Sequence, residues 1–306
     1  MGERKPKGRE VSGWLCLDKT AGQPSTQAVA SVKRLFGAAK VGHAGTLDPL
    51  ATGILPIALG EATKTVSFVQ DGRKVYRFTV RWGIETDTDD AEGKVVATAE
   101  GPPDRAAIET LLSEFTGDIM QRPPAYSAIK VGGERAYDRA RGGEEVTLEE
   151  RLVSVHRLAI AEMPDADHTV LEAECGKGTY VRALARDLGR RLGCLGHVTA
   201  LRRLVVGPFD ASTMLPLDAL ITAREEGSVV TLDRFLLPIG FVLGDLPEVA
   251  VAAADAARIR RGQSVLFRGR DAPISPGAAH ATHGGRSIAV GEIGEGAFHP
   301  KRVFRD

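Results

Sequence analysis

The sequence has few cysteines, no long apolar run and no metal-ligand spacing, and each absence removes a class of protein. Its three cysteines, Cys16, Cys175 and Cys194, are far apart and never form a C-x-x-C pair. They therefore indicate neither a disulfide framework nor a zinc site. No apolar stretch approaches the roughly 18 residues that cross a bilayer. Residues 1–10 also lack the apolar core of a signal peptide, so we expect a soluble protein of the reducing cytoplasm.

The sequence also lacks an excess of charge of either sign. Its 40 Lys and Arg residues balance 40 Asp and Glu residues, which by itself argues against a nucleic-acid partner. The distribution argues the other way, because basic residues are concentrated in two stretches. The first holds Lys177, Arg182, Arg186, Arg190, Arg191, Arg202 and Arg203, and the second holds Arg258, Arg260, Arg261, Arg268 and Arg270. Each stretch is either a surface that neutralises phosphates or a solvated helix face.

Two polar loops resemble known binding motifs but depart from them at decisive positions. Residues 85–93 (ETDTDDAEG) are acidic, yet Ala91 and Glu92 stand where a calcium loop would need Asp or Asn and then Gly. Lys177 is followed by Gly178 rather than by Ser or Thr, which excludes a nucleotide-binding P-loop. The sequence therefore indicates neither a calcium site nor a P-loop.

Periodicity predicts a mixture of strands and helices. Residues 75–82 alternate, with Tyr76, Phe78, Val80 and Trp82 on one face, which is the period of a strand. Further strands are predicted at residues 14–17, 94–98, 169–175 and 265–267, and a hairpin at residues 287–292 and 297–304. One helix is predicted from a cap at Ser25 or Thr26 to a stop at Gly37. Further helices are predicted at residues 105–115, 180–192, 217–226 and 255–261.

The length favours two domains, because about 150 residues is typical of one. We place the boundary in residues 236–247, which proline and glycine interrupt. We expect a disordered basic tail at residues 1–10, one domain at 11–243 and a small β-rich domain at 244–306. Within the first domain, residues 122–143 combine Pro-Pro and Gly-Gly pairs with several basic residues. They predict either a mobile insertion that faces a substrate or an ordinary surface loop.

The most distinctive stretch is residues 42–53 (GHAGTLDPLATG), where one acid, one imidazole and three glycines lie between two apolar segments. Glycine permits a positive φ and close approach by another molecule, and Pro49 keeps Asp48 out of the α region. The stretch therefore predicts a shaped loop. Taken alone, Asp48 is typical of a turn acid and His43 of a hydrogen-bonded structural histidine.

Extended to residues 41–60 (VGHAGTLDPLATGILPIALG), this stretch resembles the active-site motif of the TruB family, the bacterial tRNA pseudouridine synthases. Further segments agree with the family in order and spacing: residues 13–25 (GWLCLDKTAGQPS), 73–83 (RKVYRFTVRWG), 123–142 (PPAYSAIKVGGERAYDRARG), 175–189 (CGKGTYVRALARDLG) and 193–204 (GCLGHVTALRRL). The resemblance covers about residues 11–240. It implies an α+β pseudouridine-synthase fold, with a mixed, mainly antiparallel sheet flanked by helices. It also implies a small C-terminal β-rich, PUA-like RNA-binding domain.

The resemblance implies an isomerase that converts the T-loop uridine at tRNA position 55 to pseudouridine by base flipping, without cofactor or metal. Asp48 would be the catalytic carboxylate, which either attacks C1′ or removes the C2′ proton. Arg182 would pair with Asp48, Asp90 would complete their network, and Tyr76 would lie against the uracil and serve the C5 proton step. The implied substrate-binding residues are His43, Lys19, Tyr180 and Leu201, and His43 would fill the space that the flipped uridine leaves. The expected partner is the T arm of tRNA, and we expect a monomer with no membrane partner and no obligatory protein partner.

Three other functions fit parts of the sequence: an RNA-binding module, a guide-RNA-directed synthase and a hydrolase. In a non-catalytic tRNA-binding or folding module Asp48 would be only structural, but binding phosphate gains nothing from the carboxylates of Asp48 and Asp90. A guide-RNA-directed synthase of archaea and eukaryotes would need partner proteins, and the compact C-terminal unit and the insertion fit the stand-alone type better. A hydrolase that uses Asp48 and His43 would need a Gly-x-Ser-x-Gly motif or metal-ligand spacing, which the sequence lacks.

Overall fold

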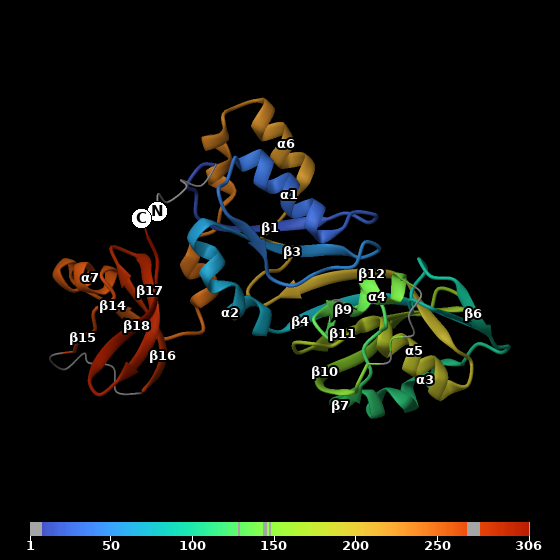
Figure 1. The fold of residues 1–306 in the computed structure, drawn as a ribbon. Helices are drawn as coiled ribbons and strands as arrows, with labels where there is room; N and C mark the ends of the chain where they lie inside the picture. Colours follow the sequence, from blue (N-terminus) through green and yellow to red (C-terminus); the bar gives the residue numbers. More distant parts are fainter. Residues whose placement is uncertain (1–7, 128, 143–145, 147, 268–275, 306) are drawn as a thin grey trace.

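The computed structural model describes residues 8–127, 129–142, 146, 148–267 and 276–305, which form two sheets with helices around them (Figure 1). The larger sheet contains β1 (Gly13–Lys19), β2 (Val41–His43), β3 (Thr52–Leu59), β4 (Lys74–Trp82), β7 (Gly117–Gln121), β10 (Arg151–Glu162), β11 (His168–Cys175), β12 (Gly196–Val206) and β13 (Met214–Pro216). The smaller sheet contains β14 (Glu248–Ala250), β15 (Val265–Leu266), β16 (Gly277–His283), β17 (Arg286–Gly294) and β18 (Ala297–Val303). Two strand pairs stand apart, β5 (Ile84–Thr86) with β6 (Val95–Thr98) and β8 (Lys130–Val131) with β9 (Glu134–Arg135).

The helices are α1 (Ser25–Phe36), α2 (Val66–Asp71), α3 (Arg105–Leu112), α4 (Ala136–Arg141), α5 (Val181–Leu192), α6 (Leu217–Glu225) and α7 (Ala253–Arg260). Short 3₁₀ helices are η1 (Gly60–Thr65), η2 (Ser113–Phe115), η3 (Val229–Phe235) and η4 (Ile239–Leu243). No helix within the described ranges is long and apolar enough to cross a membrane.

The larger sheet is mixed and mainly antiparallel, as predicted. Its strands follow the order β13-β1-β3-β12-β4-β11-β10-β7, and β2 pairs with β3 beside β1. Only the β1–β13 and β3–β12 pairs in this sheet are parallel, among the residues that the structure describes. The parallel β3–β12 pair holds the centre of the sheet together through two residue pairs, Thr52 with Arg202 and Gly53 with Arg203.

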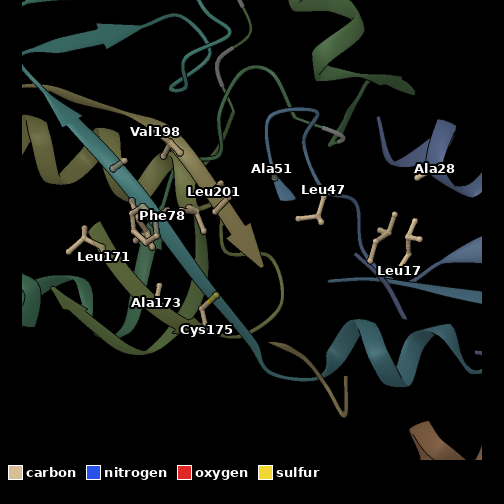
Figure 2. Close-up of a cluster of buried hydrophobic side chains, with 14 of the residues drawn as sticks. Leu17, Ala28, Leu47, Ala51, Phe78, Leu171, Ala173, Cys175, Val198 and Leu201 are labelled. Carbon is tan, nitrogen blue, oxygen red and sulfur yellow. The ribbon is translucent and has the colours of Figure 1, made fainter. Parts of the chain in front are cut away.

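Both faces of the larger sheet are covered, and the side-chain alternation of β1 shows how. Leu15 and Leu17 point into one core with α1, α3, α5 and α6, whereas Trp14 and Cys16 point into another with η1, α2 and η4. Successive strand residues point to opposite faces, so this short apolar strand contributes to both cores. Figure 2 shows the first core, in which Phe78 of β4 lies between Leu201 of β12 and Leu171 of β11.

The first helix begins in an unexpected way. Pro24 occupies the N-cap position and no side chain caps the helix, so the predicted cap by Ser25 or Thr26 is wrong. Ser25 is instead the first helical residue, and its hydroxyl bonds both backbone groups of Leu47. The predicted stop is confirmed, because Gly37 adopts φ 59°, the left-handed conformation that ends many helices.

The insertion at residues 122–143 contains regular structure. Gly132 and Gly133, at φ 62° and 95°, turn the short β8–β9 hairpin, and α4 follows directly. The backbone N–H of Tyr137 donates to the carbonyl of Ser127 over 3.1 Å, which ties the start of α4 to the residues before the hairpin. Composition alone did not reveal this hairpin, because its strands contain two residues each. Residues 128 and 143 lie outside the described ranges.

The predicted C-terminal β-rich unit is built on the smaller sheet, whose strand order is β14-β16-β17-β18-β15. The β17–β18 hairpin forms around Gly294 and Gly296 as expected, while β14 and β16 were not predicted. Phe304 and Val290 pack in the same core as Trp14, so side chains join the smaller sheet to the larger one. A division into domains after residue 243 stays a prediction.

The predicted disordered tail at residues 1–10 is too long. Residues 1–7 lie outside the described ranges, but Arg9 is held firmly. Its N–H donates to the carbonyl of Gly37 over 2.6 Å, and its guanidinium pairs with Asp233 over 2.6 Å.

Gly53 allows the two halves of the larger sheet to meet. It has φ 95°, and a Cβ at this position would lie 2.3 Å from the carbonyl oxygen of Arg203. Gly117 has the same φ of 95°, but no atom lies within 4 Å of the place that its Cβ would take. Comparing alanine substitutions at Gly53 and Gly117 therefore separates the free-energy cost of a steric clash from that of placing a Cβ at a positive φ.

We expect Gly53→Ala to lower the free energy of unfolding by about 2 kcal/mol more than Gly117→Ala does, because only the first substitution forces two strands apart. Urea unfolding of both variants measures the difference. Equal losses would show that the close approach at Gly53 has no energetic importance.

Candidate functional site

A cavity of about 350 Å³ opens beside the loop between β2 and β3, which we call the Asp48 loop (residues 44–51). Its walls come from that loop, from β4 and β12 and from the start of α5. Five of the eight predicted site residues line it: Asp48, Tyr76, Tyr180, Arg182 and Leu201. Leu47 and Ala51 are apolar side chains of this loop. Figure 2 shows that they lie between Leu201 and Leu17 in the first core.

The cavity contains a carboxylate that a buried arginine orients. Arg182 Nε lies 3.0 Å from Asp48 Oδ2, and Arg182 Nη2 donates to Asp48 Oδ1 over 3.2 Å. The Arg182 side chain is 6% exposed and the Asp48 side chain 34% exposed. The arginine is thus enclosed by protein while the carboxylate remains open to the cavity. Paired contacts to the two carboxylate oxygens fix the plane of the carboxylate as well as its position.

Asp90 lies behind the arginine rather than in the cavity. Its Oδ2 is 3.3 Å from Arg182 Nη1, and its side chain is 4% exposed. Its Oδ1 accepts hydrogen bonds from Thr88 Oγ1 over 2.6 Å and from the backbone N–H of Glu92 over 3.0 Å. Arg182 also donates to the carbonyls of Thr88 and Tyr126, over 2.8 and 2.9 Å. The predicted Asp48, Arg182 and Asp90 network therefore forms, with Asp90 orienting the arginine.

Two further side chains hold the backbone of the Asp48 loop. Ser25 Oγ donates to the carbonyl of Leu47 over 2.8 Å and accepts from its N–H over 2.9 Å. Arg203, which is 2% exposed, donates to the carbonyls of Ile54 over 2.7 Å and Gly45 over 3.1 Å. The loop is therefore fixed from the α1 side and from the β12 side.

Lys19 supports the loop as well, which differs from its predicted role. Its ammonium donates to the carbonyls of Gln23 over 2.7 Å, Thr20 over 2.9 Å and Pro49 over 3.1 Å. Lys19 is 1% exposed and does not line the cavity. All three ammonium donors are used by backbone, so Lys19 holds the residue after Asp48, and a substrate contact by Lys19 stays a prediction.

His43 ends β2 and directly precedes the Asp48 loop. It is half-buried, it does not line the cavity, and burial lowers the pKa of its imidazole. Its Nδ1 is enclosed without a hydrogen-bond partner in the part of the chain that the structure describes. A substrate contact by His43 stays a prediction.

Comparison with known proteins places this geometry in a family. The model for the TruB family pseudouridylate synthase N-terminal domain matches residues 33–181, and the model for the tRNA pseudouridylate synthase B C-terminal domain matches residues 182–243. A protein named tRNA pseudouridine synthase B from Bradyrhizobium diazoefficiens is 60% identical to this chain, over 97% of this chain and 86% of its own length. The protein of that name from Nitrobacter winogradskyi is 59% identical, over 97% of this chain and 83% of its own length. The protein of that name from Agrobacterium fabrum is 54% identical over 98% of this chain and 97% of its own. The chain belongs to the TruB family.

Solved structures show the same fold. A Cbf5-Nop10-Gar1 complex contains a chain that matches 96% of this one with a TM-score of 0.71 and 23% identity, and 85% of that chain is covered. An archaeal box H/ACA sRNP Nop10-Cbf5 complex contains a chain that matches 99% of this one with a TM-score of 0.73 and 23% identity, and 93% of that chain is covered. At this identity the likeness establishes the α+β fold of this TruB-family chain and nothing finer.

Both tyrosines of the TruB-family cavity are neutral phenols at neutral pH. Burial raises the pKa of Tyr76, against a lowering effect of the nearby Arg203. Burial also raises the pKa of Tyr180. Tyr180 occupies the N-cap position of α5. Its N–H donates to Gln121 Oε1 over 2.8 Å, and its carbonyl accepts from Gln121 Nε2 over 3.2 Å. Both uncharged rings line the cavity.

The basic stretch at residues 177–203 is divided between the interior and the surface, and neither interpretation of it predicted the buried members. Arg182, Arg186 and Arg203 are buried. The remaining members of the stretch pair with acids: Lys177 with Asp71, Arg190 with Glu85, Arg191 with Glu114 and Arg202 with Asp18. The three buried arginines therefore belong to the interior of the TruB-family chain, whereas the other four basic side chains form exposed ion pairs, which contribute little to stability. Of the second basic stretch, Arg268 and Arg270 lie outside the described residues.

Three residues that sequence reasoning did not assign to the TruB-family site support it: Ser25, Arg203 and Asp89. Ser25 was interpreted as a helix cap and Arg203 as part of a basic stretch. Asp89 was considered only as part of an acidic turn. Ser25 and Arg203 fall within segments that resemble the family, which was the available signal for them, whereas Asp89 lies outside those segments. The described residues contain no group of three or more His, Cys, Asp or Glu side chains placed to hold a metal ion.

Asp89 is the most perturbed acid near the site. It is 6% exposed, and its Oδ2 accepts from Arg186 Nη1 over 2.9 Å. Burial raises the pKa of its carboxyl from 3.8 to about 6, although Arg186, Arg182 and Arg190 all lower it. The folded protein thus holds the Asp89 proton more tightly than the unfolded chain does.

The pH dependence of stability should reveal this shift when Asp89→Asn is compared with the unmodified chain. A carboxyl whose pKa is raised on folding contributes stability below pH 3.8, and this contribution is lost as the pH rises to about 6. The unfolding free energy of the unmodified chain relative to the variant should therefore fall by up to about 3 kcal/mol across that range. Urea unfolding at a series of pH values measures it, and a difference that is constant or rises with pH would contradict the shift.

Proposed function

We propose that this protein is a tRNA pseudouridine synthase that isomerises the T-loop uridine at position 55. The observation that carries the proposal is the Asp48 carboxylate, which faces the cavity while the buried Arg182 orients it. The name that the relatives share, tRNA pseudouridine synthase B, supports the same reaction. A non-catalytic tRNA-binding module is not favoured, because such a module has no use for a carboxylate held open to a cavity.

The reaction exchanges one bond for another within a single nucleotide. The bond from uracil N1 to ribose C1′ breaks, the base turns, C5 bonds to C1′, the C5 proton leaves and N1 gains a proton. Positive charge develops at C1′ as N1 departs, so a fixed carboxylate beside the sugar stabilises the transition state. Asp48 provides that carboxylate, as a nucleophile at C1′ or as a base at C2′.

The cavity holds one nucleotide. Its volume of about 350 Å³ is at the lower end of the range for small-ligand sites. A stacked loop cannot enter such a space, so the uridine must leave its stack to reach Asp48. Tyr76 and Leu201 form walls against which a planar base packs. We assign His43, which precedes the Asp48 loop, to the space that the flipped uridine leaves.

The C5 proton step falls to Tyr76 in this proposal. A neutral phenol is a weak base, so Tyr76 accepts the C5 proton as it gives up its own, and the proton released in this exchange balances the one that N1 gains. Arg203 lies close enough to lower the pKa of Tyr76 and so to stabilise a developing phenolate. This assigns Arg203 a second role beside holding the loop.

RNA recognition is assigned to two parts of the chain, the insertion at residues 122–143 and the domain at residues 244–306. The insertion begins next to the site, because Arg182 binds the carbonyl of Tyr126. We propose action as a cytoplasmic monomer without an obligatory protein partner, as the resemblance to the stand-alone bacterial synthases implies. The Nop10 and Gar1 partners belong to the solved Cbf5 complexes.

The proposal is tested by measuring tritium release from C5-labelled uridine in a T-arm stem-loop. No metal or cofactor is added. Asp48→Asn should lower turnover on the order of 10³-fold or more, because the amide cannot attack C1′ or remove a proton. Stem-loop binding should stay within about threefold, since the base contacts are unchanged. The control is Asp218→Asn, which makes the same change at an exposed position on α6.

Release by the unmodified chain and by Asp218→Asn, but not by Asp48→Asn, supports the proposal. If neither the unmodified chain nor the control releases tritium while both bind the stem-loop, the RNA-binding alternative is correct. If Asp48→Asn loses binding together with turnover, Asp48 is a structural residue.

A further inference from the structure

Helix α5 carries two buried arginines one turn apart, and each is paired with a neighbouring acid of the same turn. Arg182 contacts Asp90, and Arg186 Nη1 binds Asp89 over 2.9 Å. The Asp89 backbone has φ 61°, a left-handed conformation that is uncommon for residues other than glycine. This conformation allows two adjacent carboxylates to reach two arginines on one helix. The Arg182 pair extends to Asp48, whereas the Arg186 pair has had no function assigned to it.

Arg186 uses its remaining donors in a definite way. Its Nε donates to Asp187 over 2.8 Å, and its Nη2 donates to the carbonyl of Arg122 over 2.7 Å. The Arg186 side chain is 8% exposed and the Asp187 side chain 30% exposed, so the guanidinium is largely enclosed while one of its acceptors remains accessible to water. A charge-assisted bond from a buried guanidinium to a backbone carbonyl is among the stronger contacts that can hold a loop.

The carbonyl of Arg122 is where the chain leaves β7 and the insertion begins. Three successive contacts hold this segment on α5. The side chain of Gln121 bonds the backbone of Tyr180, Arg186 binds the carbonyl of Arg122, and Arg182 binds the carbonyl of Tyr126. Arg186 therefore binds one end of the short segment at 122–126. Arg182, which orients Asp48, binds the other end.

We propose that Arg186, held by Asp89, is a positioning residue that sets the place of the 122–143 insertion relative to the Asp48–Arg182 pair. The inference rests on the proposed function, in which the insertion contacts the T arm. Arg186 does not line the cavity and touches no reacting atom. It acts through the backbone of Arg122, so its loss should weaken substrate binding more than the chemical step.

The choice of variant follows from the burial of the pair. Removing Arg186 alone would leave the Asp89 carboxylate buried and unpaired, which is strongly destabilising. The test therefore uses the double variant Asp89→Asn with Arg186→Met, which removes both charges and keeps the length of the longer side chain. If this variant does not fold, Arg186→Lys replaces it, because a lysine keeps a charge opposite Asp89 but cannot reach all three acceptors.

A matched control lies one turn further along α5. Arg190 pairs with Glu85 over 2.7 Å, so it also joins α5 to the residues that carry the acidic turn. Its guanidinium donates to both carboxylate oxygens of Glu85 and, among the residues that the structure describes, not to the backbone of the insertion. The control is Glu85→Gln with Arg190→Met, which makes the same chemical change without touching Arg122.

Hydrogen exchange is the first readout, because it needs no substrate. The amides of Ser127 and Tyr137 are bonded within the insertion, to the carbonyls of Ala125 and Ser127. In the Asp89 and Arg186 variant they should exchange about 10-fold faster, while β16 and β17 keep their rates; the control should leave all of these unchanged. Unchanged exchange at the insertion, or an equal increase throughout the molecule, would overturn the proposal.

Kinetics on the T-arm stem-loop is the second readout. We expect KM to rise about 10-fold in the variant with kcat within about twofold, and neither to change in the control. A fall in kcat at constant KM would show that the pair acts on the chemistry instead, and would overturn the positioning role. If the unmodified chain releases no tritium, the proposed function fails, and exchange at the insertion still decides whether Arg186 positions it.

Discussion

The ion pair between Asp48 and Arg182 is the interaction on which the rest of the site depends. A buried guanidinium is stable only when acceptors surround its donors. Here those acceptors come from three segments that are distant in sequence: the Asp48 loop, the turn at residues 88–90 and the carbonyl of Tyr126. The hydrogen bonds of Nη1 and Nη2 therefore fix three segments relative to one another, while Nε lies 3.0 Å from Asp48 Oδ2 without forming a directed hydrogen bond in the part of the chain that the structure describes. The carboxylate, its supporting acid and the start of the insertion become parts of a single hydrogen-bonded unit.

The same requirement explains how the Asp48 loop keeps its shape. The loop leads into β3 where β3 meets β12 through two residue pairs. Buried backbone groups beyond a ladder must find other partners. Side chains supply them: Arg203 and Lys19 donate to loop carbonyls, and the hydroxyl of Ser25 satisfies both backbone groups of Leu47. The Asp48 loop is thus held by polar side chains where β3 and β12 meet, and each side chain belongs to a different element.

Two elements with an uninterrupted period, β4 and α3, were predicted well, and two strands with a broken period, β10 and β12, were missed. The alternation of β4 and the apolar side of α3 are continuous, so the pattern in the sequence matches the buried face. In β10 the register shifts near Val155 and again near Ile160, so the alternation slips and the strand was missed. In β12 similar shifts combine with the buried Arg203, which the sequence pattern presents as a surface charge.

The sequence by itself determined local conformation and chemical type: the strand of Tyr76, the stop at Gly37, and a glycine-containing loop with Asp48 before Pro49. Its resemblance to the TruB family also identified the partners Asp48 and Arg182, which are 134 positions apart. Only the tertiary structure decided that Ser25 binds Leu47 instead of capping α1, that Lys19 holds the loop, and that Arg186 grips Arg122. The physical reason is that each of these side chains has several possible acceptors. Which acceptor it meets depends on how helices pack on the sheet, and no local pattern encodes that packing.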